Sequence, residues 1–274
     1  MAQDRPLNTP DLVSVLEWYR AAGVDIAVGE EPVNRFAQRA PARPVEATPA
    51  RQPNPADADR SEATPVVPSA FAVDPGEART LAATAQTLAE LEAIVGAYDG
   101  CGLKLRATQL CFADGNPEAQ IMLIGEAPGA EEDRQGKPFV GKSGQLLDRM
   151  LGAIGLDRTK IYIANTVPWR PPGNRTPTPE ELAICLPFLH RQVELVAPKV
   201  ILTLGGPAMQ TVFSTSTGIL KMRGRWSELT VGNHNVAAMP TLHPAYLLRN
   251  PAAKQQAWRD MLSLRQKLDA LNIG

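Results

Sequence analysis

Three stretches of this chain combine residue types that can do chemistry with spacings typical of loops. The first, residues 125–144, is rich in glycine and contains Glu126 and Phe139. Glycine lets the backbone approach a ligand closely, and the free N–H groups of a following helix can bind an anion. Phe139 adds an aromatic surface on which a base can stack. The stretch indicates either a ligand pocket or an ordinary turn from a strand to a helix.

The other two stretches each supply a polar side chain able to form directed hydrogen bonds. Asn165 begins a proline-rich loop that runs to Arg175, and His243 is followed by Pro244. An amide can donate to and accept from the edge of a base, although asparagine is also a common turn former. Proline restricts the backbone of the residue before it, so the His243 imidazole can be aimed at one atom. A single histidine in isolation is more often a packing residue.

Alternating apolar runs and helical periodicities predict the framework that holds these stretches. The predicted strands are 121–124, 161–163, 200–204 and 236–239, and the predicted helices are 146–154, 180–196 and 252–271. This order is typical of an α/β fold, a three-layer α/β/α sandwich with a central, mostly parallel, four-stranded sheet. Loops beginning at Gly125, Asn165, Gly205 and Leu242 should then meet at the carboxyl ends of the strands.

The rest of the chain divides by composition. Apolar spacing from Leu12 to Tyr19 predicts a helix within an N-terminal segment, residues 1–36. Residues 37–75 are rich in proline and alanine without periodicity, which predicts a flexible linker because such a segment cannot offset its ordering entropy by burial. A further helix is predicted from about Pro75 to Tyr98. It leads into a domain at residues 76–274 that holds all three stretches.

Charge and export signals limit the class of protein. There is no apolar run of about 18 or more residues, and the first ten residues lack the basic-then-apolar order of a secretory signal. We therefore expect a cytoplasmic protein with no membrane partner. Residues 1–96 carry 8 Lys and Arg against 14 Asp and Glu, whereas residues 97–274 carry 20 against 15. A basic folded part suits a polyanion such as DNA, although many metabolic enzymes carry as much charge.

Taken together, the three stretches resemble one known family. Residues 125–129 and 138–141 are similar to the first motif of family-four uracil-DNA glycosylases, and residues 243–249 are similar to the last. Asn165 lies between them, where that family places its base-reading asparagine. The resemblance covers roughly residues 98–271. It implies a uracil-DNA glycosylase-like fold and a DNA-repair hydrolase that cleaves the N-glycosidic bond of deoxyuridine and leaves an abasic site.

The resemblance also implies a role for each site residue. Phe139 stacks on uracil, Asn165 hydrogen-bonds its edge, and His243 donates to the O2 oxygen on which charge develops. Glu126 positions the attacking water or stabilises the cationic sugar; its alternative role is a salt-bridged or capping carboxylate. The remaining substrate-binding positions are Gly125 and Ala127. No motif lysine is placed for Schiff-base attack, so we expect base removal without strand scission.

Basic residues near these loops are expected to contact the DNA backbone. They are Lys142, Arg170, Arg175, Arg223, Arg225 and Arg249. No obligatory protein partner is evident. Rejection of thymine is not explained by a side chain, because Gly129 stands where some relatives carry a tyrosine; backbone or Phe139 packing would have to serve.

The cysteines depart from the family pattern. Cys101, Cys111 and Cys185 are too few and too widely spaced for a disulfide framework or a C-x-x-C metal ribbon. Family four ligates a four-iron cluster through four cysteines, and Cys101 and Cys185 match two of those positions. The other two are Tyr98 and Trp169. Two thiolates cannot replace four, so we expect no iron–sulfur cluster or other metal, with the two aromatic rings filling the space.

Two other functions stay open at this point. Missing cluster ligands can signal decay, which would leave a non-catalytic binder of uracil-containing or abasic DNA. The intact Phe139, Asn165 and His243 argue against decay. A nucleotide-binding metabolic enzyme on an open α/β sheet would explain the glycine-rich stretch but not the His243-Pro244 loop.

Overall fold

The structure, a computed structural model, describes residues 75–273. The predicted N-terminal helix and all of the predicted linker except Pro75 lie outside this part of the chain. The predicted start of the main domain, residue 76, falls on the second residue of helix α2 (Pro75–Thr84).

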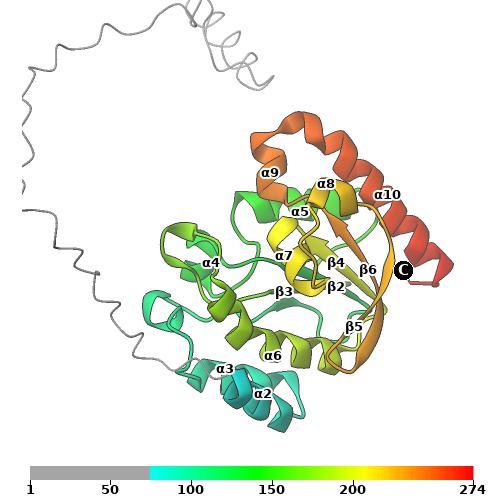
Figure 1. The fold of residues 1–274 in the computed structure, drawn as a ribbon. Coiled ribbons are helices and arrows are strands. Elements are labelled where there is room, and N and C mark those ends of the chain that lie inside the picture. The colour runs from blue at the N-terminus through cyan, green and yellow to red at the C-terminus, as the bar shows by residue number, and fades with distance from the viewer. Residues whose placement is uncertain (1–74, 274) are drawn as a thin grey trace, which may run out of the picture. The chain divides into compact units, whose positions relative to one another are not determined.

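A six-stranded sheet runs through the middle of the described part, in the order β1-β3-β2-β4-β6-β5 (Figure 1). Its strands are β1 (Asp114–Gly115), β2 (Ile121–Gly125), β3 (Tyr162–Asn165), β4 (Val200–Leu204), β5 (Ser227–Val231) and β6 (His234–Thr241). The four central strands are parallel and correspond to the four predicted ones. The two edge strands, β1 and β5, pair antiparallel and were not predicted.

Helices cover both faces of the sheet, which confirms the predicted three-layer sandwich. They are α2, α3 (Leu88–Ala97), α4 (Ala130–Gln135), α5 (Lys142–Gly152), α6 (Pro179–Val196), α7 (Gly206–Val212), α8 (Ile219–Met222), α9 (Pro244–Arg249) and α10 (Lys254–Ala270). Side chains of a strand point alternately to its two faces. On β2, Leu123 accordingly packs with Leu147 of α5 and Met261 of α10, whereas Ile124 packs with Leu189 of α6.

The single helix predicted from Pro75 to Tyr98 is wrong, because two helices occupy that segment. Thr87 is the N-cap of α3: its side chain accepts a hydrogen bond from the Glu90 N–H at 3.1 Å, and the Glu90 carboxylate accepts one from the Gln86 N–H at 2.7 Å. These two capping hydrogen bonds favour a fresh helix start over continuation of α2. Both helices lie against α6 (Figure 1).

The carboxyl ends of the parallel strands bring four loops to one edge of the sheet, as predicted from their order. Hydrogen bonds join neighbouring loops there, from the Thr166 N–H to the Gly125 carbonyl (2.9 Å) and from the Gly205 N–H to the Thr241 carbonyl (2.9 Å). Between residues 75 and 273 no helix has the length and apolar character to cross a membrane.

Candidate active site

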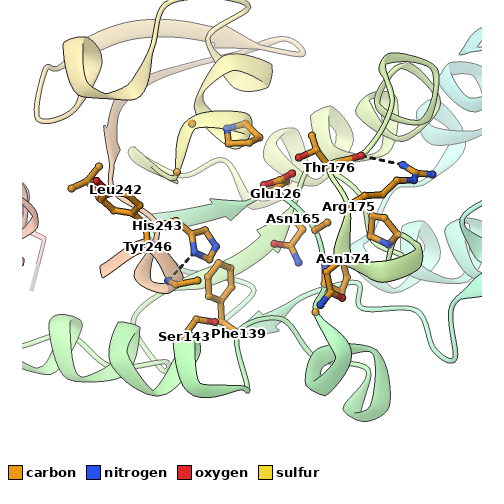
Figure 2. Close-up of a pocket in the computed structure, with 18 of the residues that line it drawn as sticks. Glu126, Phe139, Ser143, Asn165, Asn174, Arg175, Thr176, Leu242, His243 and Tyr246 are labelled. Atoms are coloured by element: carbon orange, nitrogen blue, oxygen red, sulfur yellow. Dashed lines mark hydrogen bonds between the residues drawn. The ribbon is translucent and has the colours of Figure 1, made fainter. Parts of the chain in front are cut away.

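A cavity of about 610 Å³ opens at the carboxyl edge of the parallel strands (Figure 2). The loops after β2, β3, β4 and β6 all contribute to its wall. Glu126, Ala127, Phe139, Asn165 and His243 line it. Residues separated by more than a hundred positions in the sequence therefore face one space, and all three predicted stretches contribute to it.

His243 is held in a defined orientation and protonation state. It is the N-cap of α9, and the Ala245 N–H donates to its Nδ1 at 3.0 Å. Because Nδ1 accepts, the proton of the neutral ring is on Nε2, which is left free to donate. Burial lowers the pKa of His243 to about 4, the charge of Arg249 acts in the same direction, and Glu132 opposes them. His243 is therefore a neutral hydrogen-bond donor at physiological pH.

Phe139 forms the adjoining wall. Its ring is 5% exposed and lies stacked against the His243 imidazole, with 5.5 Å between the ring centroids and 30° between the planes. Gly125 makes room for this arrangement, because a Cβ there would lie 2.6 Å from Phe139 Cε2 and would overlap the Asn165 side chain. A glycine at this position is thus required by the packing of the two pocket side chains above it.

Asn165 is buried at the end of β3, with its amide group at the cavity. Within the described residues its Oδ1 accepts no hydrogen bond. A buried polar atom left unpaired costs about 1–3 kcal/mol of stability, so the stability of the fold does not explain an asparagine at this position. A ligand N–H directed at Oδ1 would supply the missing partner.

Glu126 supplies the carboxylate of the cavity. It is half-buried and faces the space from the loop after β2, close to Thr176 in Figure 2. Burial raises the pKa of Glu126, and hydrogen bonding by the Thr176 side chain opposes that rise. The backbone beneath it is fixed, since the Glu126 carbonyl accepts from the Thr166 hydroxyl at 2.6 Å.

The sequence is similar to those of known proteins. The sequence profile of the uracil DNA glycosylase superfamily matches residues 112–262, more than half of the chain. The chain is 44% identical over 151 residues to the type-4 uracil-DNA glycosylase of Thermotoga maritima, covering 55% of this chain and 77% of that protein. It is 38% identical over 171 residues to the type-4 uracil-DNA glycosylase of Sulfurisphaera tokodaii, covering 61% and 78%.

The chain belongs to the type-4 family of uracil-DNA glycosylases. Its similarity to another branch of the superfamily is shorter. It is 34% identical over 115 residues to the type-5 uracil-DNA glycosylase of Thermus thermophilus, which covers 36% of this chain and 52% of that protein.

The cations predicted to contact DNA are distributed unevenly around the cavity of this glycosylase. Arg175 and Arg249 line it, and both are exposed. Arg175 is also paired with Glu181, with 2.6 Å between Nη2 and Oε1. Lys142, at the start of α5, and Arg225 are exposed but do not line the cavity.

The other two cations bond within the protein. Arg170 donates to Asn174 Oδ1 at 2.7 Å. The Arg223 guanidinium bonds to the Asp260 carboxylate and to the Gln256 carbonyl, and Asp260 is 2% exposed. Arg223 thus has a structural role as the partner of a buried charge.

The cysteines of this family member do not fit a four-thiolate cluster. Cys101 and Cys185 are buried, with 3.8 Å between their Sγ atoms. Tyr98 and Trp169, 6% and 2% exposed, belong to the same apolar cluster. Cys111 bonds elsewhere, donating to the Glu132 carbonyl at 3.0 Å. From residue 75 to residue 273, no three His, Cys, Asp or Glu side chains gather closely enough to hold a metal ion.

Several residues that line the cavity have no role predicted from the sequence. Thr176 lies beside Glu126, Tyr246 projects from α9 and Ile219 begins α8. Tyr246 falls inside the last family motif. The loop predicted to begin at Gly205 does reach the cavity, which Gly205 and Gly206 line. No pattern in the local sequence marks Ile219 as a pocket residue, because its place in the cavity wall depends on the path of residues 213–223.

Proposed function

We propose that this protein is a monofunctional uracil-DNA glycosylase of base excision repair, a hydrolase that cleaves the N-glycosidic bond of deoxyuridine and leaves an abasic site. The observation that carries the proposal is the convergence of Phe139, Asn165 and a neutral His243 on one cavity. The names of the relatives support the same activity.

Uracil must leave the base stack to react, because the glycosidic bond is inaccessible inside a duplex. In the cavity, Phe139 stacks on the ring, and Asn165 accepts from N3–H while donating to O4. Cytosine would present an unprotonated N3 to the same amide oxygen, which would leave buried groups unpaired and reject it. Position 129 has no room for a side chain that could exclude the methyl group of thymine, because a Cβ there would lie 2.7 Å from Glu132 Oε2. Exclusion of thymine therefore depends on the residues that already form the cavity wall.

His243 stabilises the leaving base. As the C1′–N1 bond lengthens, negative charge moves onto the uracil O2 and positive charge onto the sugar. The Nε2–H of His243 donates to O2 without transferring its proton, because a donor fixed in advance needs no reorganisation during the reaction. Water then attacks C1′ on the face opposite the base, with Glu126 orienting it or stabilising the sugar cation.

The pH dependence of excision tests the role of Glu126. Its ionised form is needed, and burial raises its pKa above the ordinary 4.5, so the rate should fall as pH decreases through a value above 4.5. His243 becomes protonated at lower pH, since its pKa is about 4. Glu126→Gln should lower the plateau by about 100-fold and abolish this acid limb. Single-turnover rates from pH 4 upward measure both effects; an unchanged limb in Glu126→Gln would assign it to another group.

We propose strand scission to be absent, because the described cavity wall contains no lysine for Schiff-base formation. Phosphate contacts are proposed for five of the six predicted cations, led by Arg249, which lines the cavity; Arg223 is left out because its guanidinium is bonded to Asp260. We propose a cytoplasmic location, because the proposed substrate is DNA. We propose no obligatory protein partner.

We further propose that catalysis needs no iron–sulfur cluster. The support is the side-chain set: two thiols and two buried aromatic rings stand where four thiolates would be required.

Replacing Cys101 and Cys185, the two cysteines at cluster positions, tests whether catalysis is independent of a cluster. The double variant Cys101→Ala, Cys185→Ala should retain most of the excision rate and lose about 1–2 kcal/mol of stability, because small buried groups are removed. Single-turnover excision and thermal melts measure the two quantities. Iron analysis of the wild type completes the test: stoichiometric iron, with loss of both iron and activity in the double variant, would contradict the proposal.

The direct test of function is single-turnover release of uracil from a labelled single-stranded oligonucleotide without added metal. Alkali-dependent strand breaks at the uracil are expected. Tight binding of the oligonucleotide without breaks would establish the alternative, a non-catalytic binder of uracil-containing or abasic DNA. The type-4 relatives and the intact polar groups of the cavity favour catalysis.

A further inference from the structure

The loop that carries Phe139 has a backbone conformation that needs support. Phe139 has φ of 55°, in the left-handed region that residues with bulky side chains rarely adopt. Such a conformation persists only where the surroundings hold it. A stacking surface for a base must also be fixed in place, so the groups that hold this backbone bear on recognition.

One side of the loop is held by an anion. The Glu132 Oε1 atom accepts hydrogen bonds from the Val140 N–H at 3.1 Å and from the Gly141 N–H at 3.0 Å. These are the two peptide groups that directly follow Phe139. Glu132 is buried and lines the cavity, so this contact belongs to the pocket wall itself.

The other side of the loop is held by a cation from outside the pocket. The Arg158 guanidinium donates to the Phe139 carbonyl through Nη2 and to the Pro138 carbonyl through Nη1, the latter at 3.4 Å. Arg158 lies on the connection between α5 and β3 and does not line the cavity. The peptide group that follows the strained residue is thus bonded to side chains of opposite charge, Arg158 at its carbonyl and Glu132 at its N–H.

Arg158 is itself fixed by two carboxylates. Its Nη1 lies 2.5 Å from Asp114 Oδ2 on β1, and its Nε lies 2.9 Å from Asp148 Oδ1 on α5. A side chain at Gly144 would overlap the Phe139 carbonyl, so the loop lies directly on the start of α5. Arg158 therefore ties the Phe139 carbonyl to the sheet edge and to a helix at once.

We infer that Arg158 is a positioning residue for uracil recognition, which fixes the Phe139 ring by holding its carbonyl in the left-handed conformation. The inference rests on the proposed role of Phe139 as the stacking surface. Without the guanidinium, the carbonyls at 138 and 139 lose their donor, the backbone relaxes, and the ring leaves its place beside His243. Misplacement of a contact group by about 1 Å can cost a factor of about 100 in rate.

The chain offers a matched control. Arg191 is buried to a similar degree as Arg158, with side-chain exposures of 22% and 26%. It also donates to a main-chain carbonyl, that of Ala85 at 2.7 Å, and pairs with a carboxylate, Glu194 at 2.8 Å. Neither Arg191 nor its partners line the cavity. Arg191→Met therefore removes bonds of the same two kinds, though fewer of them, without touching the Phe139 loop.

The experiment compares Arg158→Met, Arg158→Lys and Arg191→Met in the full chain. Excision is measured in single turnover. Affinity is measured for two single-stranded oligonucleotides, one with non-cleavable 2′-fluoro-deoxyuridine and one with a tetrahydrofuran abasic analogue. Arg158→Met should slow excision by about 10- to 100-fold and weaken binding of the uracil oligonucleotide only. Arg158→Lys should not rescue it, because one ammonium cannot span both carbonyls and both carboxylates. Arg191→Met should excise at the wild-type rate.

Further variants separate this inference from the proposed function. Phe139→Ala should slow excision, and Arg158→Met added to it should cause no further loss. Normal excision by Arg158→Met alongside slow excision by Phe139→Ala would overturn only the inference, as would equal loss of binding to both oligonucleotides. Normal excision by Phe139→Ala would refute the stacking role and the inference with it. Should Arg158→Met not fold, Asp148→Asn must show the same base-selective loss at smaller size, and its absence would also overturn the inference.

Discussion

His243→Ala should lower the single-turnover rate of uracil excision by about 1000-fold, since it removes a donor aimed at the oxygen that becomes negative. The ring is already neutral, with the Ala245 N–H on Nδ1, so the variant removes the Nε2–H donor rather than a general acid. Affinity for an abasic oligonucleotide should change little, because that DNA has no O2 to contact. Rate and affinity together show that the loss concerns the base and not binding of the DNA backbone.

Another histidine provides the control for this variant. His234 hydrogen-bonds the Pro198 carbonyl through Nε2 at 2.7 Å and does not line the cavity. His234→Ala should therefore excise uracil at the wild-type rate. Excision by His243→Ala within a few-fold of the wild type would show that the O2 oxygen is stabilised by another group.

Asn165→Asp should lower the uracil excision rate by a comparable factor, about 1000-fold. The change keeps the shape of the side chain but replaces its donor with an oxygen, which would face the O4 of the base. It also places an ionisable carboxyl in a buried site where Oδ1 already has no partner among the described residues. Single-turnover release of uracil from single-stranded DNA measures the effect.

Asn116 supplies the comparison for Asn165. Its amide donates to the Thr159 carbonyl at 3.0 Å, and its Oδ1 accepts from the Glu118 N–H at 2.9 Å, outside the cavity wall. Asn116→Asp makes the same chemical change as Asn165→Asp and also loses an amide donor, but it should leave the excision rate unchanged. Equal rates for the Asn165 and Asn116 variants would mean that the amide at 165 does not read the base.

The convergence of the pocket residues was predictable from sequence because it follows from strand order. Asn165 and His243 each come just after a buried apolar run, and the carboxyl ends of parallel strands share one edge. The edge strands carried weaker signals. β1 has two residues, and β5 alternates polar with apolar side chains at the sheet margin, so neither forms a long apolar run.

Contacts between distant residues were not predictable in the same way. Arg223 was expected at the DNA backbone, and only the fold reveals Asp260, 37 positions later, as the partner of its guanidinium. The same holds for Arg158, whose surroundings in sequence, Asp157 and Thr159, are those of an ordinary turn. The N-cap residue Thr87 marks the break between the two helices in the local sequence, but the apolar periodicity on either side of it predicts one continuous helix.

The packing around Cys101, Cys185, Tyr98 and Trp169 has a consequence for the cell that makes this protein. Apolar contacts form as the chain folds, whereas a metal cofactor must be delivered by dedicated assembly proteins. On the proposal that no cluster is bound, this region needs no iron to pack, and the enzyme should accumulate in active form during iron starvation. On the same proposal, the excision activity should also withstand the oxidants that destroy exposed clusters.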